Sequence, residues 1–204
     1  MGKTNVIPSM TPSVVHAYLR HVGRSWTGQG VAMELGCWLG ASSHPLLEGL
    51  TEAGYDKPFY AYDLWTANKD QVIRAAQSGM MLTEGQDIAP IYEANIKKIY
   101  KYILMQKGRI PGTLDSYPGE PIEVCVFDAP KRNEVFCGAV KKLLPRFIPG
   151  VTVWGLLDYY SYRKKSAKDQ VRFMAPQRVT SKGFTLLAHW PEQCSCAFFR
   201  YDGS

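Results

Sequence analysis

The chain has 204 residues, of which 46% are hydrophobic and 12% aromatic, and its formal net charge is +6. This composition is enough for one sizeable folded core and excludes an intrinsically disordered chain. No run of about 18 apolar residues is present, and the first ten residues lack the apolar stretch of a secretory signal. We therefore expect a soluble cytoplasmic protein without a membrane partner.

The positive charge is concentrated in one part of the chain. Residues 131–178 contain eleven Lys and Arg side chains but only three acids. Such a segment favours an anionic substrate or nucleic acid, although lysines on a helix surface also have this composition. The five cysteines are odd in number and scattered, which favours reduced thiols over a disulfide framework.

Strand and helix patterns alternate along most of the chain. Apolar runs predict strands at residues 31–35, 59–64, 102–105, 122–127, 151–157, 185–189 and 195–200. Helical spacing predicts helices near residues 11–25, 43–53, 71–80, 88–99, 135–144 and 167–174, and residues 112–121 read as a loop. This order predicts an α/β sandwich with a mainly parallel sheet and a C-terminal antiparallel strand pair. We expect a single domain over residues 1–204, made of an N-terminal helical segment, 1–28, and a core, 29–204.

The most informative stretch runs from residue 31 to residue 50, where a short apolar strand enters a glycine turn and then a helix. Gly36 and Gly40 supply the conformational freedom for a sharp turn, and we expect their missing side chains to let a ligand come close. Ser42 or Ser43 is expected to cap the helix, whose free backbone N–H groups face whatever lies above the strand. This arrangement predicts a cofactor site.

An acid at the end of the second strand supports the same site. Asp63 follows Gly40 by twenty-three residues, close to the spacing of about 20 at which an acid bonds ribose hydroxyls in doubly wound folds. The glycine pattern is E-x-G-x-x-x-G, beginning at Glu34, and this disfavours the G-x-G-x-x-G site of nicotinamide enzymes. An acid near the turn suits a sulfonium cation and an amino acid group instead, whereas in a purely structural connection Glu34 would only make a hydrogen bond.

The pattern resembles motif I of class I S-adenosylmethionine-dependent methyltransferases. The resemblance implies a Rossmann-like three-layer sandwich and S-adenosylmethionine as the cofactor. The residues it places at the cofactor are Glu34, Gly36, Cys37, Trp38, Gly40, Ser42, Asp63, Leu64 and Asp128.

Residues 30–200 resemble a narrower group, the macrocin O-methyltransferase-like enzymes. The resemblance is based on E-L-G-C-W-L-G-A-S at 34–42, Y-D-L at 62–64, K-G-R-I-P-G-T-L at 107–114, V-F-D-A-P at 126–130 and L-L-D-Y-Y at 156–160. It implies O-methylation of a small hydroxylated acceptor, such as a sugar or an anionic molecule. It also implies that Asp128 and Asp158 hold a divalent metal, such as Mg²⁺, which lowers the pKa of the acceptor hydroxyl.

The chain departs from that family at the second acidic position, where Leu157 stands beside Asp158 in place of an acid pair. A metal-bound and a metal-free site therefore remain alternatives. Without metal, either the catalytic base would be Asp128, Asp158 or Lys131 with a lowered pKa, or the reaction would depend only on the proximity of the acceptor to the sulfonium. Because parallel strands end at one edge of the sheet, we expect the acids at the strand ends to converge there.

Two other functions stay open at this point. The first is methylation of RNA, because Asp128-Ala129-Pro130 resembles a motif of some RNA ribose methyltransferases and the basic segment suits phosphate backbones. The second is a noncatalytic relative that keeps the fold and binds a ligand or a partner. The oligomeric state does not follow from the sequence.

Overall fold

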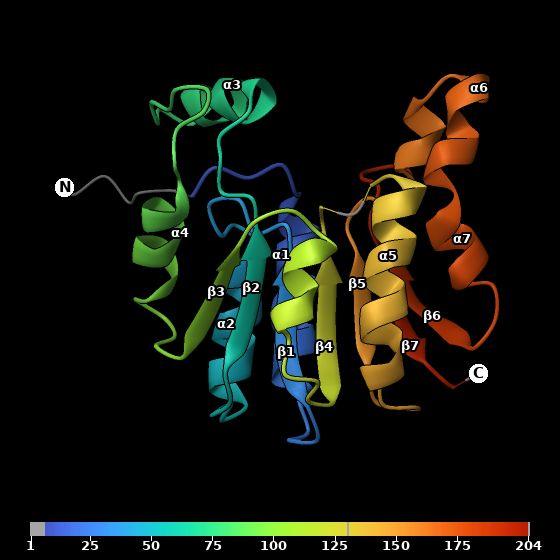
Figure 1. Ribbon diagram of the computed structural model, residues 1–204. Coiled ribbons are helices and arrows are strands. Elements are labelled where there is room, and N and C mark those ends of the chain that lie inside the picture. The colour runs from blue at the N-terminus through green and yellow to red at the C-terminus, as the bar shows by residue number, and fades with distance from the viewer. Residues whose placement is uncertain (1–6, 130, 204) are drawn as a thin grey trace.

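The computed structural model describes residues 7–129 and 131–203, and within them seven strands form one sheet in the order β3-β2-β1-β4-β5-β7-β6 (Figure 1). The first five strands pair in parallel, whereas β7 pairs antiparallel with both β5 and β6. The bounds are β1 Val31–Leu35, β2 Phe59–Asp63, β3 Ile103–Lys107, β4 Ile122–Phe127, β5 Val153–Leu156, β6 Phe184–His189 and β7 Ala197–Tyr201. The predicted α/β fold is thus confirmed, including the terminal antiparallel pair.

The central strands are apolar because helices cover both faces of the sheet. Every residue of β1 and of β4 is buried, and each strand is apolar except for one glutamate, Glu34 in β1 and Glu123 in β4. The longer helices are α1 Ser13–Arg24, α2 Ser43–Glu52, α3 Lys69–Gln77, α4 Ala89–Ile96 and α5 Asn133–Leu143. Short helical segments follow near the C-terminus, α6 Ala167–Gln170 and α7 Ala175–Val179.

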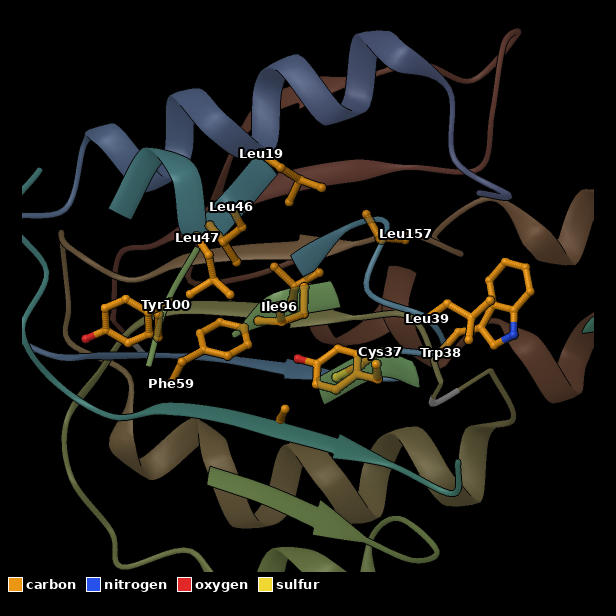
Figure 2. Packing of buried hydrophobic residues seen from close by; sticks show 14 of the residues in the cluster. Leu19, Cys37, Trp38, Leu39, Leu46, Leu47, Phe59, Ile96, Tyr100 and Leu157 are labelled. Carbon is orange, nitrogen blue, oxygen red and sulfur yellow. The ribbon is translucent and has the colours of Figure 1, made fainter. Parts of the chain in front are cut away.

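The core is divided by the sheet into two apolar clusters. One cluster joins α1, α2 and α4 to the sheet, and Figure 2 shows Leu19, Leu46 and Ile96 meeting there. The other cluster joins α5 and α7 to the opposite face through residues such as Phe136 and Trp154. The result is the expected three-layer sandwich. Among the described residues, no helix is long and apolar enough to cross a membrane.

The N-terminal helix is fixed to the helix that follows β1. Arg20 and Arg24 of α1 both pair with the carboxylate of Glu52 at the end of α2. The buried side of α1, with Leu19 fully covered, faces the first cluster. This packing brings residues 7–12, which precede α1, to the region above the carboxyl ends of the strands.

Three local predictions need correction. Residues 112–116 of the expected loop form a 3₁₀ helix, η1 Gly112–Ser116. The expected helix over 167–174 is α-helical only as far as Gln170 and continues as a 3₁₀ helix over Val171–Phe173, and Pro176 lies in the first turn of a separate helix, α7. Neither Ser42 nor Ser43 caps α2 through its hydroxyl.

Candidate active site

A cavity of about 320 Å³ lies at the carboxyl ends of β1, β2 and β4. Its walls come from the segment Ser9–Thr11, the turn after β1, the end of β2, the start of α3 and the loop after β4. Figure 1 shows α3 standing above the ends of the strands on this side of the sheet. The cavity therefore lies where ligands bind in open α/β sheets.

Two positions in the turn after β1 require glycine, because other parts of the chain lie too close for a side chain. Gly36 has φ +95°, and a Cβ atom there would lie 2.5 Å from the backbone nitrogen of Ala129. Gly40 also has φ +95°, but its open side faces α4, where a Cβ would lie 2.7 Å from Ile96 Cδ1. Of the two predicted glycines, Gly36 lines the cavity and Gly40 does not. The expectation that the missing side chains make room for a ligand is wrong for Gly40, because α4 takes up that space.

Glu34 is completely buried beneath this turn and does not line the cavity. Its carboxylate accepts hydrogen bonds from the hydroxyls of Ser42 and Ser43, which explains why these serines do not cap α2. Burial raises the pKa of Glu34 to about 7, although the two serine hydrogen bonds oppose the shift. Glu34 thus ties the end of β1 to the start of α2.

Asp63 presents its carboxylate to the cavity at the end of β2. Its oxygens accept the backbone N–H groups of Trp38 at 2.8 Å and Trp65 at 2.6 Å. Burial raises the pKa of Asp63, while these backbone hydrogen bonds favour the charged form. Both carboxylate oxygens are therefore held in fixed positions at the cavity wall.

Trp65 is a supporting residue that the sequence patterns do not indicate. It is fully buried, has φ +43°, and donates from Nε1 to the carbonyl oxygen of Trp38 at 3.1 Å. Trp38 likewise has a positive φ, of 45°. Together with Asp63, the two tryptophans hold the turn after β1 against the end of β2.

The other predicted cofactor residues lie as follows. Cys37, Trp38, Ser42 and Leu64 all line the cavity, and Cys37 is almost completely buried. The cavity is also lined by residues that the sequence patterns do not indicate, namely residues 9–11, Asn68, Asp70 and Gln71. Asn68 and Gln71 form a reciprocal capping box at the start of α3, and an N-cap residue just before a helical pattern is the signal that identifies such a position.

Asp128, Lys131 and Asp158 gather beside this cavity. Asp128 and Lys131 line both it and a smaller adjoining cavity, which Asp158 also lines. Lys131 Nζ lies 2.8 Å from Asp158 Oδ2. Burial and the neighbouring Asp158 raise the pKa of Asp128 well above its ordinary range.

The environment of Lys131 bears on its predicted role as a base. Burial disfavours its positive charge, but Asp128 and Asp158 outweigh this effect, so the pKa of Lys131 is raised rather than lowered. The expectation of a lowered pKa is therefore wrong, because two carboxylates face the ammonium group. Lys131 acts here as a cation.

The residues present do not fit the implied divalent metal. Within residues 7–129 and 131–203, no group of three His, Cys, Asp or Glu side chains is placed to hold a metal ion. Leu157 occupies the position of the missing acid and packs into the apolar cluster with α1 and α2. The remaining pair, Asp128 and Asp158, already faces the ammonium group of Lys131.

Sequence comparisons do not assign the chain to a family. No family model matches it, and a search of curated proteins finds no match.

Structure comparisons, in contrast, match almost the whole chain to methyltransferases. The O-methyltransferase NovP is 14% identical, with a TM-score of 0.68 over 96% of this chain and 83% of that one. The methyltransferase PaMTH1 of Podospora anserina, solved with bound SAH, is 11% identical, with a TM-score of 0.59 over 95% and 80% of the two chains. CalS11, described as a TDP-rhamnose 3'-O-methyltransferase of calicheamicin biosynthesis, is 12% identical, with a TM-score of 0.56 over 93% and 78%. The chain shares the Rossmann-like fold of these enzymes.

Proposed function

We propose that this protein is a class I S-adenosylmethionine-dependent methyltransferase that methylates a hydroxyl group of a small molecule. The observation that carries the proposal is the position of Asp63, which faces a cavity at the end of β2 while backbone N–H groups hold its carboxylate. The fold shared with NovP, PaMTH1 and CalS11 supports the same activity.

The cavity residues divide into those that would contact the cofactor and those that shape its site. Asp63 would accept the ribose hydroxyls, and Gly36, Cys37, Trp38, Ser42 and Leu64 would surround the rest of the molecule. Glu34 and Gly40 do not line the cavity and would shape the site by holding the residues that do. S-adenosylmethionine fits this site because the lining combines an acid and polar groups with apolar surface.

Asp128 lines the cofactor cavity together with Lys131, and Asp158 lies beside them. S-adenosylmethionine supplies a methyl group whose bond to sulfur breaks, leaving the electron pair on sulfur, as the acceptor oxygen bonds to carbon. Asp128 would accept the proton of the acceptor hydroxyl, since a carboxylate with a raised pKa is a stronger base. Lys131 would hold the neighbouring Asp158 and place positive charge near the acceptor oxygen.

An anionic acceptor is favoured by basic side chains close to this site. Arg132, Lys165 and Arg172 line a polar cavity of about 500 Å³ at the start of α5, together with two acids. Lys131, which immediately precedes Arg132 in the chain, lines the cofactor cavity. CalS11 acts on a nucleotide-linked sugar according to its description, and an acceptor of that anionic class is consistent with these side chains.

The direct test measures cofactor binding. Calorimetric titration with S-adenosylmethionine should give saturable binding to the wild-type protein, and titration with NAD should give none. Asp63→Asn should weaken binding about 10-fold or more, because a hydrogen bond to a charged acceptor contributes roughly 1.5–3 kcal/mol. Asp56→Asn, at an exposed residue outside the cavity, is the matched control and should bind as the wild type does.

A second variant separates binding from catalysis. Asp128→Asn should keep S-adenosylmethionine affinity within a few fold but lower turnover of a methylated acceptor by about 10²–10⁴-fold, the usual contribution of a general base. An acceptor screen with hydroxylated sugars and nucleotide-linked sugars supplies the assay. Equal loss of cofactor binding in the Asp63 and Asp128 variants would contradict the division of roles, and absence of any S-adenosylmethionine binding to the wild type would overturn the proposed function.

A further inference from the structure

The loop after β4 places the ammonium group of Lys131 beside Asp128 and Asp158, which follow β4 and β5. Lys131 Nζ lies 2.8 Å from Asp158 Oδ2 and forms an ion pair with it. The lysine side chain is 51% exposed, whereas that of Asp158 is 26% exposed, so the ammonium group covers the carboxylate from the solvent side. Asp128 and Lys131 both line the cofactor cavity as well.

A divalent cation would need the same oxygen atoms. Mg²⁺ prefers six oxygen ligands in a near-octahedral arrangement, commonly one or two carboxylates completed by water and substrate oxygens. Asp158 Oδ2 already faces an ammonium group, and a dication in hydrogen-bond range of that group would be repelled by it. With Lys131 in place, its ammonium group offsets the negative charge of these acids.

The chain also lacks a replacement ligand at the neighbouring position. Leu157 is 5% exposed and packs into the apolar cluster that includes Leu19 and Leu46, so it points away from Asp158. Within the described part of the chain, no third His, Cys, Asp or Glu completes a metal-binding group at this site. The carboxyl groups of Asp128 and Asp158 therefore suit an ammonium group, which needs fewer ligands than Mg²⁺ does.

We propose that the ammonium group of Lys131 takes the place of a divalent cation between Asp128 and Asp158, so that this site functions with a cation supplied by the chain itself. The remaining N–H donors of Lys131 are then free to meet the acceptor oxygen, and this part of the inference rests on the proposed methyltransferase function. Lys131 thereby differs from a surface lysine, whose removal would alter neither cation binding nor the reaction.

The test uses Mn²⁺ as a probe, measured by the loss of its free electron paramagnetic resonance signal on binding. Wild-type protein should show no saturable binding, whereas Lys131→Met should bind one Mn²⁺ with a dissociation constant on the order of 1 mM or tighter, the range of weak carboxylate sites. Adding Asp158→Asn to Lys131→Met should remove that binding. Lys131→Arg, which keeps the positive charge, should behave as the wild type does.

Two results would overturn the proposal. One is saturable Mn²⁺ binding to the wild type that Asp158→Asn abolishes, since the acids would then hold a metal despite the lysine. The other is failure of Lys131→Met to bind Mn²⁺ while its thermal unfolding stays cooperative, since the lysine would then not be what keeps the ion out. S-adenosylmethionine titration of the same proteins tests the proposed function separately, because the Mn²⁺ result does not depend on cofactor binding.

Discussion

At the scale of single residues, the carboxylate side chains at the ends of different strands have different roles. Glu34 does not line the cavity and accepts hydrogen bonds from two serines, whereas Asp63 lies in the cavity wall. Asp158 pairs with a lysine. The sequence places an acid at or near the ends of β1, β2, β4 and β5, but packing decides which carboxylate can contact a ligand and which is bonded inside the protein.

Glu34 gives a pH dependence of stability. Its pKa is raised from an ordinary value of 4.5 to about 7 by burial, so between these values the unfolded chain releases a proton that the folded chain retains. Stability should therefore fall as the pH rises from 4.5 to about 7 and change no further above it, with a total effect of about 3 kcal/mol. Glu34→Gln, which cannot ionise, should reduce this fall when unfolding is measured by urea titration between pH 5 and 8. An unchanged pH profile in the variant would contradict the assignment.

At the scale of elements, the turn between β1 and α2 is held by close backbone approach. Gly36→Ala would combine a positive φ with a Cβ atom 2.5 Å from Ala129 N, and we expect a stability loss of about 3 kcal/mol or more. Gly54→Ala is the matched control, because Gly54 also has a positive φ, of 80°, but nothing lies within 4 Å of an added Cβ. That control should lose only about 1 kcal/mol.

Chemical denaturation of the two variants checks this difference. Equal losses would show that backbone conformation alone, rather than the approach of the β4 loop, requires glycine at position 36. The Gly36 variant should also bind S-adenosylmethionine more weakly, because the turn and the loop after β4 both line the cavity.

The elements that the sequence predicts best are those with both faces buried. β1 and β4 have the predicted bounds, since a strand covered on two sides is mostly apolar along its length. The prediction is poorest near the C-terminus, where α6, η4 Val171–Phe173 and α7 are too short to show a full helical period. The cavity residues at 9–11 and at the start of α3 cannot be predicted from local patterns, because contacts between distant parts of the chain bring them to the site.

At the scale of the whole molecule, we expect residues 1–204 to unfold as one domain. The first cluster contains residues of α1, α2, α4 and the sheet, so the N-terminal helix cannot leave without exposing Leu46 and Leu50. Scanning calorimetry should show one transition whose calorimetric and van't Hoff enthalpies agree, with a value of about 140 kcal/mol near 60 °C. Two transitions would indicate that the segment 1–28 or the C-terminal strand pair folds separately.

The antiparallel direction of β7 has a practical consequence for how the protein is handled. Since β7 runs opposite to β5, with Arg200 beside Val153, it ends at the amino edge of the parallel strands, far from the cavity. Residues 9–11 at the other end of the chain form part of the cavity wall. An affinity tag that follows β7 would therefore begin on the side of the sheet away from the cavity, whereas an N-terminal tag would precede the segment that contributes residues 9–11 to the cavity wall. Binding assays on this protein are best made with the tag at the C-terminus.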